Sequence, residues 1–106
     1  MAASAFATAI DVLFADPNLG VDVIYRTGGA GPGTIIRAII RQPDRISTFG
    51  ETRIATATLM IDVRVSEVAA PAEGDTLEMK GTIYVIQGEP IRDAERLIWT
   101  IEARPR

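Results

Sequence analysis

The stretch RIATATLMIDVRVS, residues 53–66, decides the fold class. Every second position in its later part carries an apolar side chain, namely Ala57, Leu59, Ile61, Val63 and Val65. The positions between them carry threonine, methionine, aspartate and arginine. A period of two is the pattern of a β-strand with one buried and one exposed face. The segment therefore predicts a long, half-exposed antiparallel strand.

Five further segments are predicted to be strands, at residues 20–26, 34–41, 75–79, 82–87 and 96–104. The segment TIIRAIIR at 34–41 is ambiguous, because its isoleucines also form a helical stripe opposite Arg37 and Arg41. Four β-branched isoleucines, with glycines before them and Pro43 after, favour a strand.

Glycine and proline mark the turns between these segments. Residues 69–75 (AAPAEGD) form one turn, and Lys80 with Gly81 forms the tight turn of a hairpin between 75–79 and 82–87. The chain breaks again at Gly88 and Pro90 and then crosses a charged loop at 91–96. Short strands separated by such turns are typical of small antiparallel β proteins.

Residues 4–15 carry the one helical pattern. Ser4 is the expected N-cap, Pro17 and Gly20 end the segment, and one face carries Phe6, Ile10, Leu13 and Phe14. One helix followed by about six strands predicts a mainly β fold, a small antiparallel β-barrel or sandwich with the helix over one open end or edge. We expect residues 1–106 to form a single domain, because two separate cores would each bury too little apolar surface.

The composition narrows the possible chemistry. The formal net charge is −3 and the pI is about 4.8, so no excess of basic residues favours a nucleic acid backbone. The chain has no cysteine and no histidine, which removes thiolate chemistry, sulfur metal ligands and the usual general base. The N-terminus has no basic region before its apolar residues, so no export signal is expected. No apolar run approaches the roughly 20 residues of a membrane-spanning helix.

The glycine-rich stretch GGAGPGT, residues 28–34, comes within one residue of a phosphate-binding loop. A true phosphate loop has a lysine before its final hydroxyl residue and opens a helix whose amides bind the phosphates. Here Gly33 is followed directly by Thr34, and a strand is expected next. We interpret the stretch as a loop between two strands that would be ordered by a neighbouring subunit, since glycine loses much backbone freedom on ordering.

Two groups of carboxylates were considered as catalytic or metal-binding sites: Glu67, Glu73 and Asp75, and Glu89, Asp93 and Glu95. Their spacing matches no calcium loop, and pairing with Arg92 and Arg96 is the better interpretation of the second group. The serines lack a histidine to activate them. The sequence therefore predicts no enzyme, no cofactor and no metal.

The segment QPDRISTFGET, residues 42–52, is longer than a hairpin turn requires. Long loops in small domains often carry function, and this one places apolar side chains among charges of both signs. Docking onto a partner protein is one interpretation, and packing of Phe49 onto its own core is the other. The candidate contact residues there are Asp44, Arg45, Ile46, Phe49, Glu51 and Arg53, and in the glycine-rich stretch they are Gly28, Gly29, Gly31 and Gly33.

The order of these features resembles the small head-tail joining proteins of tailed phages, prophages and gene transfer agents. The resemblance rests on DPNLGVD at 16–22 after the first helix and on GDTLEMKGTIYVIQGEPIRDAERLIWTIE at 74–102, with its GD turn, G-x-x-Y hairpin and closing strand. It implies a structural protein that assembles as a ring, of six copies by family resemblance, in the neck of a particle built in the host cytoplasm. The implied partners are portal or adaptor proteins on the head side and tail tube or terminator proteins on the tail side. DNA would pass through the lumen without sequence-specific binding.

Two alternatives remain open at this level. One is a tail terminator or another neck protein of similar size. The other is a different class of protein, a small β-barrel that binds a nucleotide or a sugar.

Overall fold

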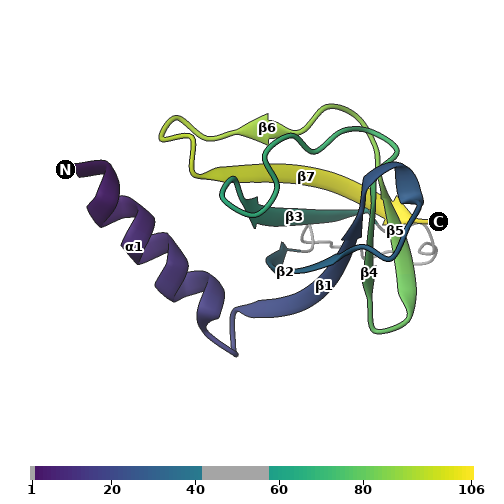
Figure 1. The fold of residues 1–106 in the computed structure, drawn as a ribbon, viewed down its shortest axis with the longest axis horizontal. Coiled ribbons are helices and arrows are strands. Elements are labelled where there is room, and N and C mark those ends of the chain that lie inside the picture. The colour runs from purple at the N-terminus through teal and green to yellow at the C-terminus, as the bar shows by residue number, and fades with distance from the viewer. Residues whose placement is uncertain (1, 42–57) are drawn as a thin grey trace, which may run out of the picture.

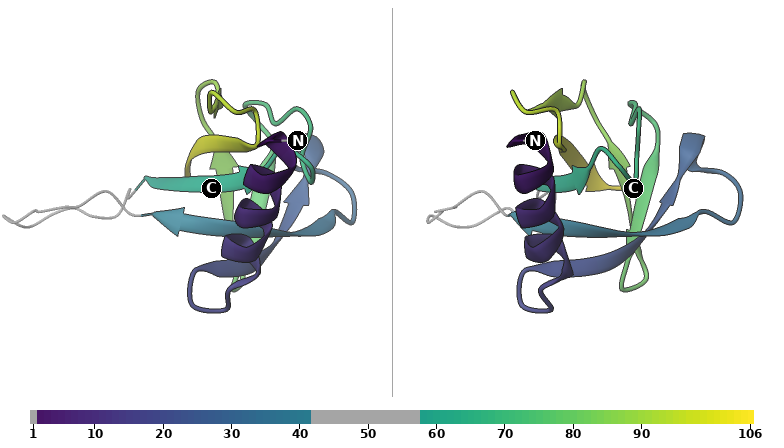
Figure 2. Two further views of the ribbon diagram at one scale, coloured as in Figure 1. Left: turned by 90° about the vertical axis from the view of Figure 1, so that its left-hand side faces the viewer. Right: turned by 60° about the vertical axis from the view of Figure 1, so that its left-hand side comes forward.

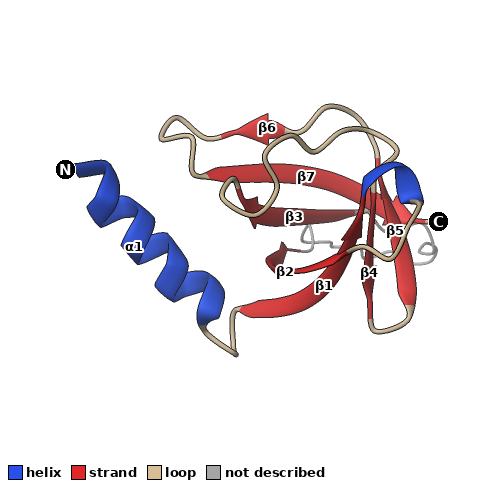
Figure 3. Cartoon of the chain, viewed as in Figure 1, coloured by secondary structure: helices blue, strands red, loops and turns tan. Residues whose placement is uncertain are grey.

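The computed structural model describes residues 2–41 and 58–106. This part of the chain folds into one α-helix, one short 3-10 helix and seven β-strands (Figures 1 and 3). In chain order they are α1 (Ala2–Ala15), β1 (Gly20–Arg26), η1 (Thr27–Gly29), β2 (Thr34–Arg41), β3 (Leu59–Arg64), β4 (Thr76–Met79), β5 (Thr82–Ile86), β6 (Ile91–Arg92) and β7 (Ile98–Pro105).

Six of the strands close into an antiparallel barrel. Their order is β3-β2-β1-β4-β5-β7, and β7 returns to pair with β3. That closing pair runs from Leu59 opposite Ala103 to Arg64 opposite Ile98. β6 is an extra strand, and it pairs with β7 at Ile91 and Arg92. The mainly β prediction is confirmed. Of the two predicted architectures, barrel and sandwich, the structure is a barrel.

The core is made of the inward side chains of the barrel strands. The alternation predicted for residues 53–66 is confirmed in β3, where Leu59, Ile61 and Val63 are buried and the residues between them are half-exposed. The buried cluster comprises Val23, Tyr25, Ile36, Ala38, Leu59, Ile61, Val63, Val68, Leu77, Ile86, Ile101 and Ala103. Trp99 is partly buried against this cluster.

The predicted strands compare closely with the observed ones. β1 and β2 have the predicted bounds, and the ambiguous segment 34–41 is a strand that buries Ile36 and Ala38. β4, β5 and β7 agree within two residues. The long strand predicted at 53–66 ends at Arg64, and residues 53–57 lie outside the described residues. The loop predicted at 91–96 is wrong at its start, because Ile91 and Arg92 pair with β7 as β6.

The hairpin between β4 and β5 turns at Lys80 and Gly81, as predicted. Both residues have positive φ angles, 51° and 84°, and Met79 pairs with Thr82 across the turn. Two consecutive residues with left-handed backbone conformations make a two-residue turn whose twist matches the twist of the strands on either side. Glycine takes the second position without steric cost.

The helix differs from its prediction in two respects. It begins at Ala2, so Ser4 lies inside it and is not the N-cap. The face toward the barrel carries Phe14, which is 1% exposed, together with the half-buried Ala7 and Ile10. Phe6 and Leu13, predicted to share that face, are 51% and 46% exposed. Figure 2 shows the helix from two further directions, crossing in front of the strands in the left view.

Candidate functional site

The glycine-rich stretch lies in the connection between β1 and β2. Gly28, Gly29, Gly31 and Gly33 all have positive φ angles, between 65° and 86°. The connection begins with the single turn η1 and leads into β2, which is a strand and not a helix. A phosphate-binding loop would lead into the N-terminus of a helix. Here a strand follows the loop, as predicted. The loop joins two antiparallel neighbours of the barrel.

The buried carboxylate of Asp75 binds this loop. Asp75 is 4% exposed, and its Oδ1 accepts a hydrogen bond of 2.8 Å from the Gly28 N–H. Its Oδ2 accepts one from the Tyr25 hydroxyl and one of 3.1 Å from the Ala72 N–H. One side chain thus ties together the end of β1, the glycine loop and the turn that precedes β4. A buried charge is tolerated in proteins when such donors surround it.

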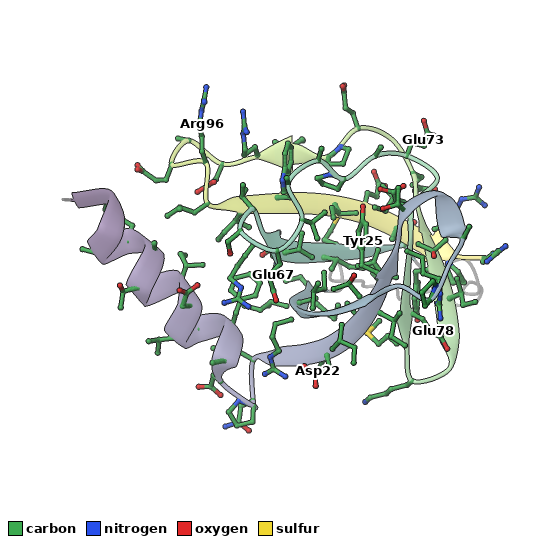
Figure 4. All side chains as sticks on the ribbon, in the orientation of Figure 1. Asp22, Tyr25, Glu67, Glu73, Glu78 and Arg96 are labelled. Carbon is green, nitrogen blue, oxygen red and sulfur yellow. The ribbon has the colours of Figure 1, made fainter. Side chains whose placement is uncertain are left out.

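Tyr25 is the side-chain partner in this cluster, and Figure 4 shows it among the barrel strands. Burial raises the pKa of the Tyr25 phenol far above its usual value, and the hydrogen bond and negative charge of Asp75 raise it further. The hydroxyl therefore keeps its proton at neutral pH and donates a hydrogen bond to Asp75 Oδ2.

Arg26 provides a second anchor on the outer side of the loop. Its Nε donates to the Gly31 carbonyl at 3.0 Å, and its Nη1 contacts the Glu78 carboxylate at 2.7 Å. The loop is thus fixed to its own chain at Gly28 and at Gly31. These contacts lie within one chain, and the contact of the four glycines with a neighbouring subunit stays a prediction.

A shallow pocket of about 230 Å³ lies beside the loop. Thr27 and Thr34 contribute from the loop's two ends, Tyr25 and Ile36 from the barrel, and Glu67, Val68, Ala69 and Ala70 from the turn after β3. Pockets for small organic ligands usually measure about 300–1,000 Å³. The size of this pocket gives little support to a nucleotide- or sugar-binding barrel.

Two arginines attach the second half of α1 to the barrel. Arg37 on β2 donates through Nε to the Phe14 carbonyl at 2.8 Å and through Nη2 to the Asp16 carbonyl at 3.3 Å. The Phe14 carbonyl lies in the last turn of α1, where carbonyls lack a partner within the helix, and a cation there also interacts favourably with the helix dipole. Gly20 is required beside this contact, since a Cβ there would lie 2.3 Å from the Phe14 carbonyl oxygen.

Arg64 is the second of these arginines. Its guanidinium lies 5.3 Å from the centroid of the Phe14 ring and contacts Asp11 at 3.0 Å and Glu67 at 2.7 Å. Burial opposes the charged form, but the hydrogen bonds to Glu67 and Asp11 outweigh it and raise the Arg64 pKa. We name Arg37 and Arg64 the arginine clamp, since both contact Phe14 near the end of α1.

The carboxylate groups considered in the sequence do not form a common site. Glu67 pairs with Arg64 of the arginine clamp, and Asp75 is buried and bonded to the glycine loop. Asp93 accepts N–H hydrogen bonds from Leu97 and Ile98 at 2.8 and 3.0 Å, and these lower its pKa although burial opposes the charged form. Arg92, expected to pair with an acid, lies over the Trp99 ring. Among the described residues no three acidic side chains gather as a metal site would require.

The candidate residues of the 42–52 loop and the strand start after it lie outside the described residues. These are Asp44, Arg45, Ile46, Phe49, Glu51 and Arg53. The four glycines of the predicted contact set lie in one loop, which Asp75 anchors at Gly28. The sequence did not predict this anchor. Within residues 2–41 and 58–106, no helix has the length and apolar character needed to cross a membrane.

The closed barrel, its anchored loop and its N-terminal helix place the chain among small antiparallel β-barrel proteins. The family model for phage head-tail attachment proteins matches residues 3–103. The chain belongs to this family, which gives it a structural role in joining phage heads to tails and contacts with head and tail components. A search of curated proteins found no match.

Proposed function

We propose that this protein forms a ring of identical copies in the neck, between the DNA-filled head and the tail, of a phage, a prophage or a gene transfer agent. The observation that carries the proposal is the family match over residues 3–103. Portal or adaptor proteins would contact one side of the ring, and tail tube or terminator proteins the other. By family resemblance the ring has six copies and assembles in the host cytoplasm.

Electrostatics support a passage for DNA through such a ring. The chain carries a formal net charge of −3, and like charge opposes adsorption of the DNA backbone. The protein would then act as a structural conduit and not as an enzyme. Residues 1–106 would work as one domain, with the closed barrel as its rigid body.

The loop at 42–52 is proposed as one contact with the neck partners, and a joining assay tests it. Heads and tails from a mutant lacking this chain are mixed with purified protein, and joined particles are counted by electron microscopy. The double variant Arg45→Ala with Phe49→Ala is expected to lower the joined fraction at least about tenfold, because truncating interface anchors commonly costs more than about 1 kcal/mol each.

The control carries Ile91→Ala with Arg96→Ala, which removes an exposed isoleucine and an exposed arginine elsewhere on the barrel. It should join heads and tails as the unmodified protein does. Equal joining by the Arg45/Phe49 variant and the unmodified protein would show that this loop is not a contact.

A further inference from the structure

The pocket beside the glycine loop has a buried floor and an exposed rim. Three core side chains form its floor, those of Tyr25, Ile36 and Val68. Its rim carries Thr27, Thr34 and Glu67. Thr34 pairs in register with Tyr25, and Figure 4 labels Tyr25 and Glu67. The pocket thus combines a largely apolar floor with two hydroxyls and one carboxylate at its rim.

Glu67 gives the rim a negative charge. Its Oε1 accepts a hydrogen bond of 3.1 Å from the Arg37 N–H and one of 2.7 Å from the Arg64 guanidinium, whereas Oε2 accepts none from a described residue. Arg64 also contacts Asp11 at 3.0 Å, so one guanidinium is shared between two carboxylates. Glu67 therefore has the charge and the free oxygen to accept a further donor.

A second carboxylate adjoins the floor of the pocket. Asp75 is 4% exposed and accepts a hydrogen bond from the Tyr25 hydroxyl. Its other donors, the Gly28 and Ala72 N–H groups, are also neutral, and no cation of the described residues pairs with it. A buried charge without an opposite partner favours a cation nearby, because water screens it weakly.

The size of the pocket restricts what it can hold. Its volume of about 230 Å³ lies below the roughly 300–1,000 Å³ of pockets for small organic ligands, and one long side chain can occupy it. Lysine and arginine bury their methylene stems on apolar surface and keep the charged head at a polar edge. Their heads are donors only, which suits hydroxyl and carboxylate acceptors.

We propose that this pocket binds the side chain of a lysine or arginine carried by another protein. The stem lies across Ile36 and Val68, and the head donates to the Thr27 and Thr34 hydroxyls and to Glu67 Oε2. A protein is the source of the side chain because the chain belongs to a family that contacts head and tail components. The site rests on that joining role and does not depend on a ring.

Titration of the complete chain, labelled with ¹⁵N, tests the site by NMR. The probes are capped tripeptides that carry one central residue between two glycines. Peptides with a central arginine or lysine are expected to shift the amide signals of Thr27, Thr34 and Val68 and to saturate at millimolar concentrations. A central methionine has a stem of similar length without charge, so it should bind at least about tenfold more weakly. A central glutamate should not bind.

Two variants that each remove one negative charge locate the site. Glu67→Gln keeps the shape of the rim and should weaken binding of the arginine peptide at least about fivefold. Glu73→Gln changes an exposed acid outside the pocket lining and should change the affinity less than about twofold. Thr34→Val removes one hydroxyl, leaves the Glu67–Arg64 pair intact, and should also weaken binding. It carries the comparison alone if Glu67→Gln lowers the melting temperature.

Four results would overturn the proposal. They are equal binding of the methionine or glutamate peptide, equal affinities in the Glu67→Gln and Glu73→Gln variants, unchanged affinity in Thr34→Val, and shifts that do not saturate. Binding of butylguanidinium without binding of the arginine peptide would also overturn it, since the pocket would then take a free small cation. Each of these results rejects the pocket as a docking site, whereas the proposed function fails only if heads and tails join without this chain.

Discussion

Replacing Asp75 with alanine is expected to lower the free energy of unfolding by about 3–5 kcal/mol. The carboxylate is buried and accepts hydrogen bonds from the Tyr25 hydroxyl and from the Gly28 and Ala72 N–H groups. Alanine would leave these donors without their acceptor, of which the Tyr25 hydroxyl is buried and the Gly28 and Ala72 N–H groups make partly buried bonds. Each such group costs about 1–3 kcal/mol when it is left unsatisfied and buried. Urea unfolding followed by tryptophan fluorescence measures the loss.

Two further variants distinguish the loss of the Asp75 hydrogen bonds from the effect of any substitution in this turn. Glu73→Ala removes an exposed acid two residues away and should change the free energy of unfolding by less than about 0.5 kcal/mol. Tyr25→Phe keeps the ring and removes one donor, so it should cost less than Asp75→Ala. If Asp75→Ala were no less stable than Glu73→Ala, the buried carboxylate would not be the anchor of the loop.

Gly33→Ala is expected to destabilise the protein by about 2–5 kcal/mol. Gly33 has a φ of 81°, and a Cβ there would lie 2.5 Å from Ile24 Cγ2 and 3.0 Å from the Tyr25 carbonyl oxygen. A left-handed conformation costs a residue with a Cβ about 1–2 kcal/mol, and crowding against packed atoms adds about 1–3 kcal/mol. Thermal and urea unfolding give the change directly.

Gly31→Ala is the matched control for this substitution. Gly31 has a φ of 86°, and a Cβ there would meet nothing within 4 Å. It should therefore lose only the backbone part, about 1–2 kcal/mol. Equal losses for the two variants would mean that close packing of the loop on Ile24 contributes nothing to stability.

The barrel strands were predictable because their pattern is local. In β3, buried Leu59, Ile61 and Val63 alternate with the half-exposed Met60, Asp62 and Arg64, so one face of the strand is buried. The turn at Lys80 and Gly81 was readable because two-residue hairpins need left-handed residues. β6 was missed because two residues cannot show a period, and Ile91 pairs with β7 while staying exposed.

The anchors of the candidate site could not be predicted, because each joins residues far apart in the chain. Asp75 and Gly28 are 47 residues apart, and Arg64 and Asp11 are 53 apart. In the sequence, Asp75 lies in a predicted turn, where an exposed aspartate is common. The glycine-rich stretch has the composition of a loop with no fixed conformation. The helix face was misassigned because α1 carries apolar side chains on more than one side, so the hydrophobic stripe does not indicate which side meets the barrel.

Electron microscopy of a lysate from a mutant that lacks this chain tests the central claim most directly. If the protein joins heads to tails, the lysate should contain DNA-filled heads and complete tails that remain separate, and the purified protein should restore joined particles. Joined, complete particles in the absence of the chain would contradict the account.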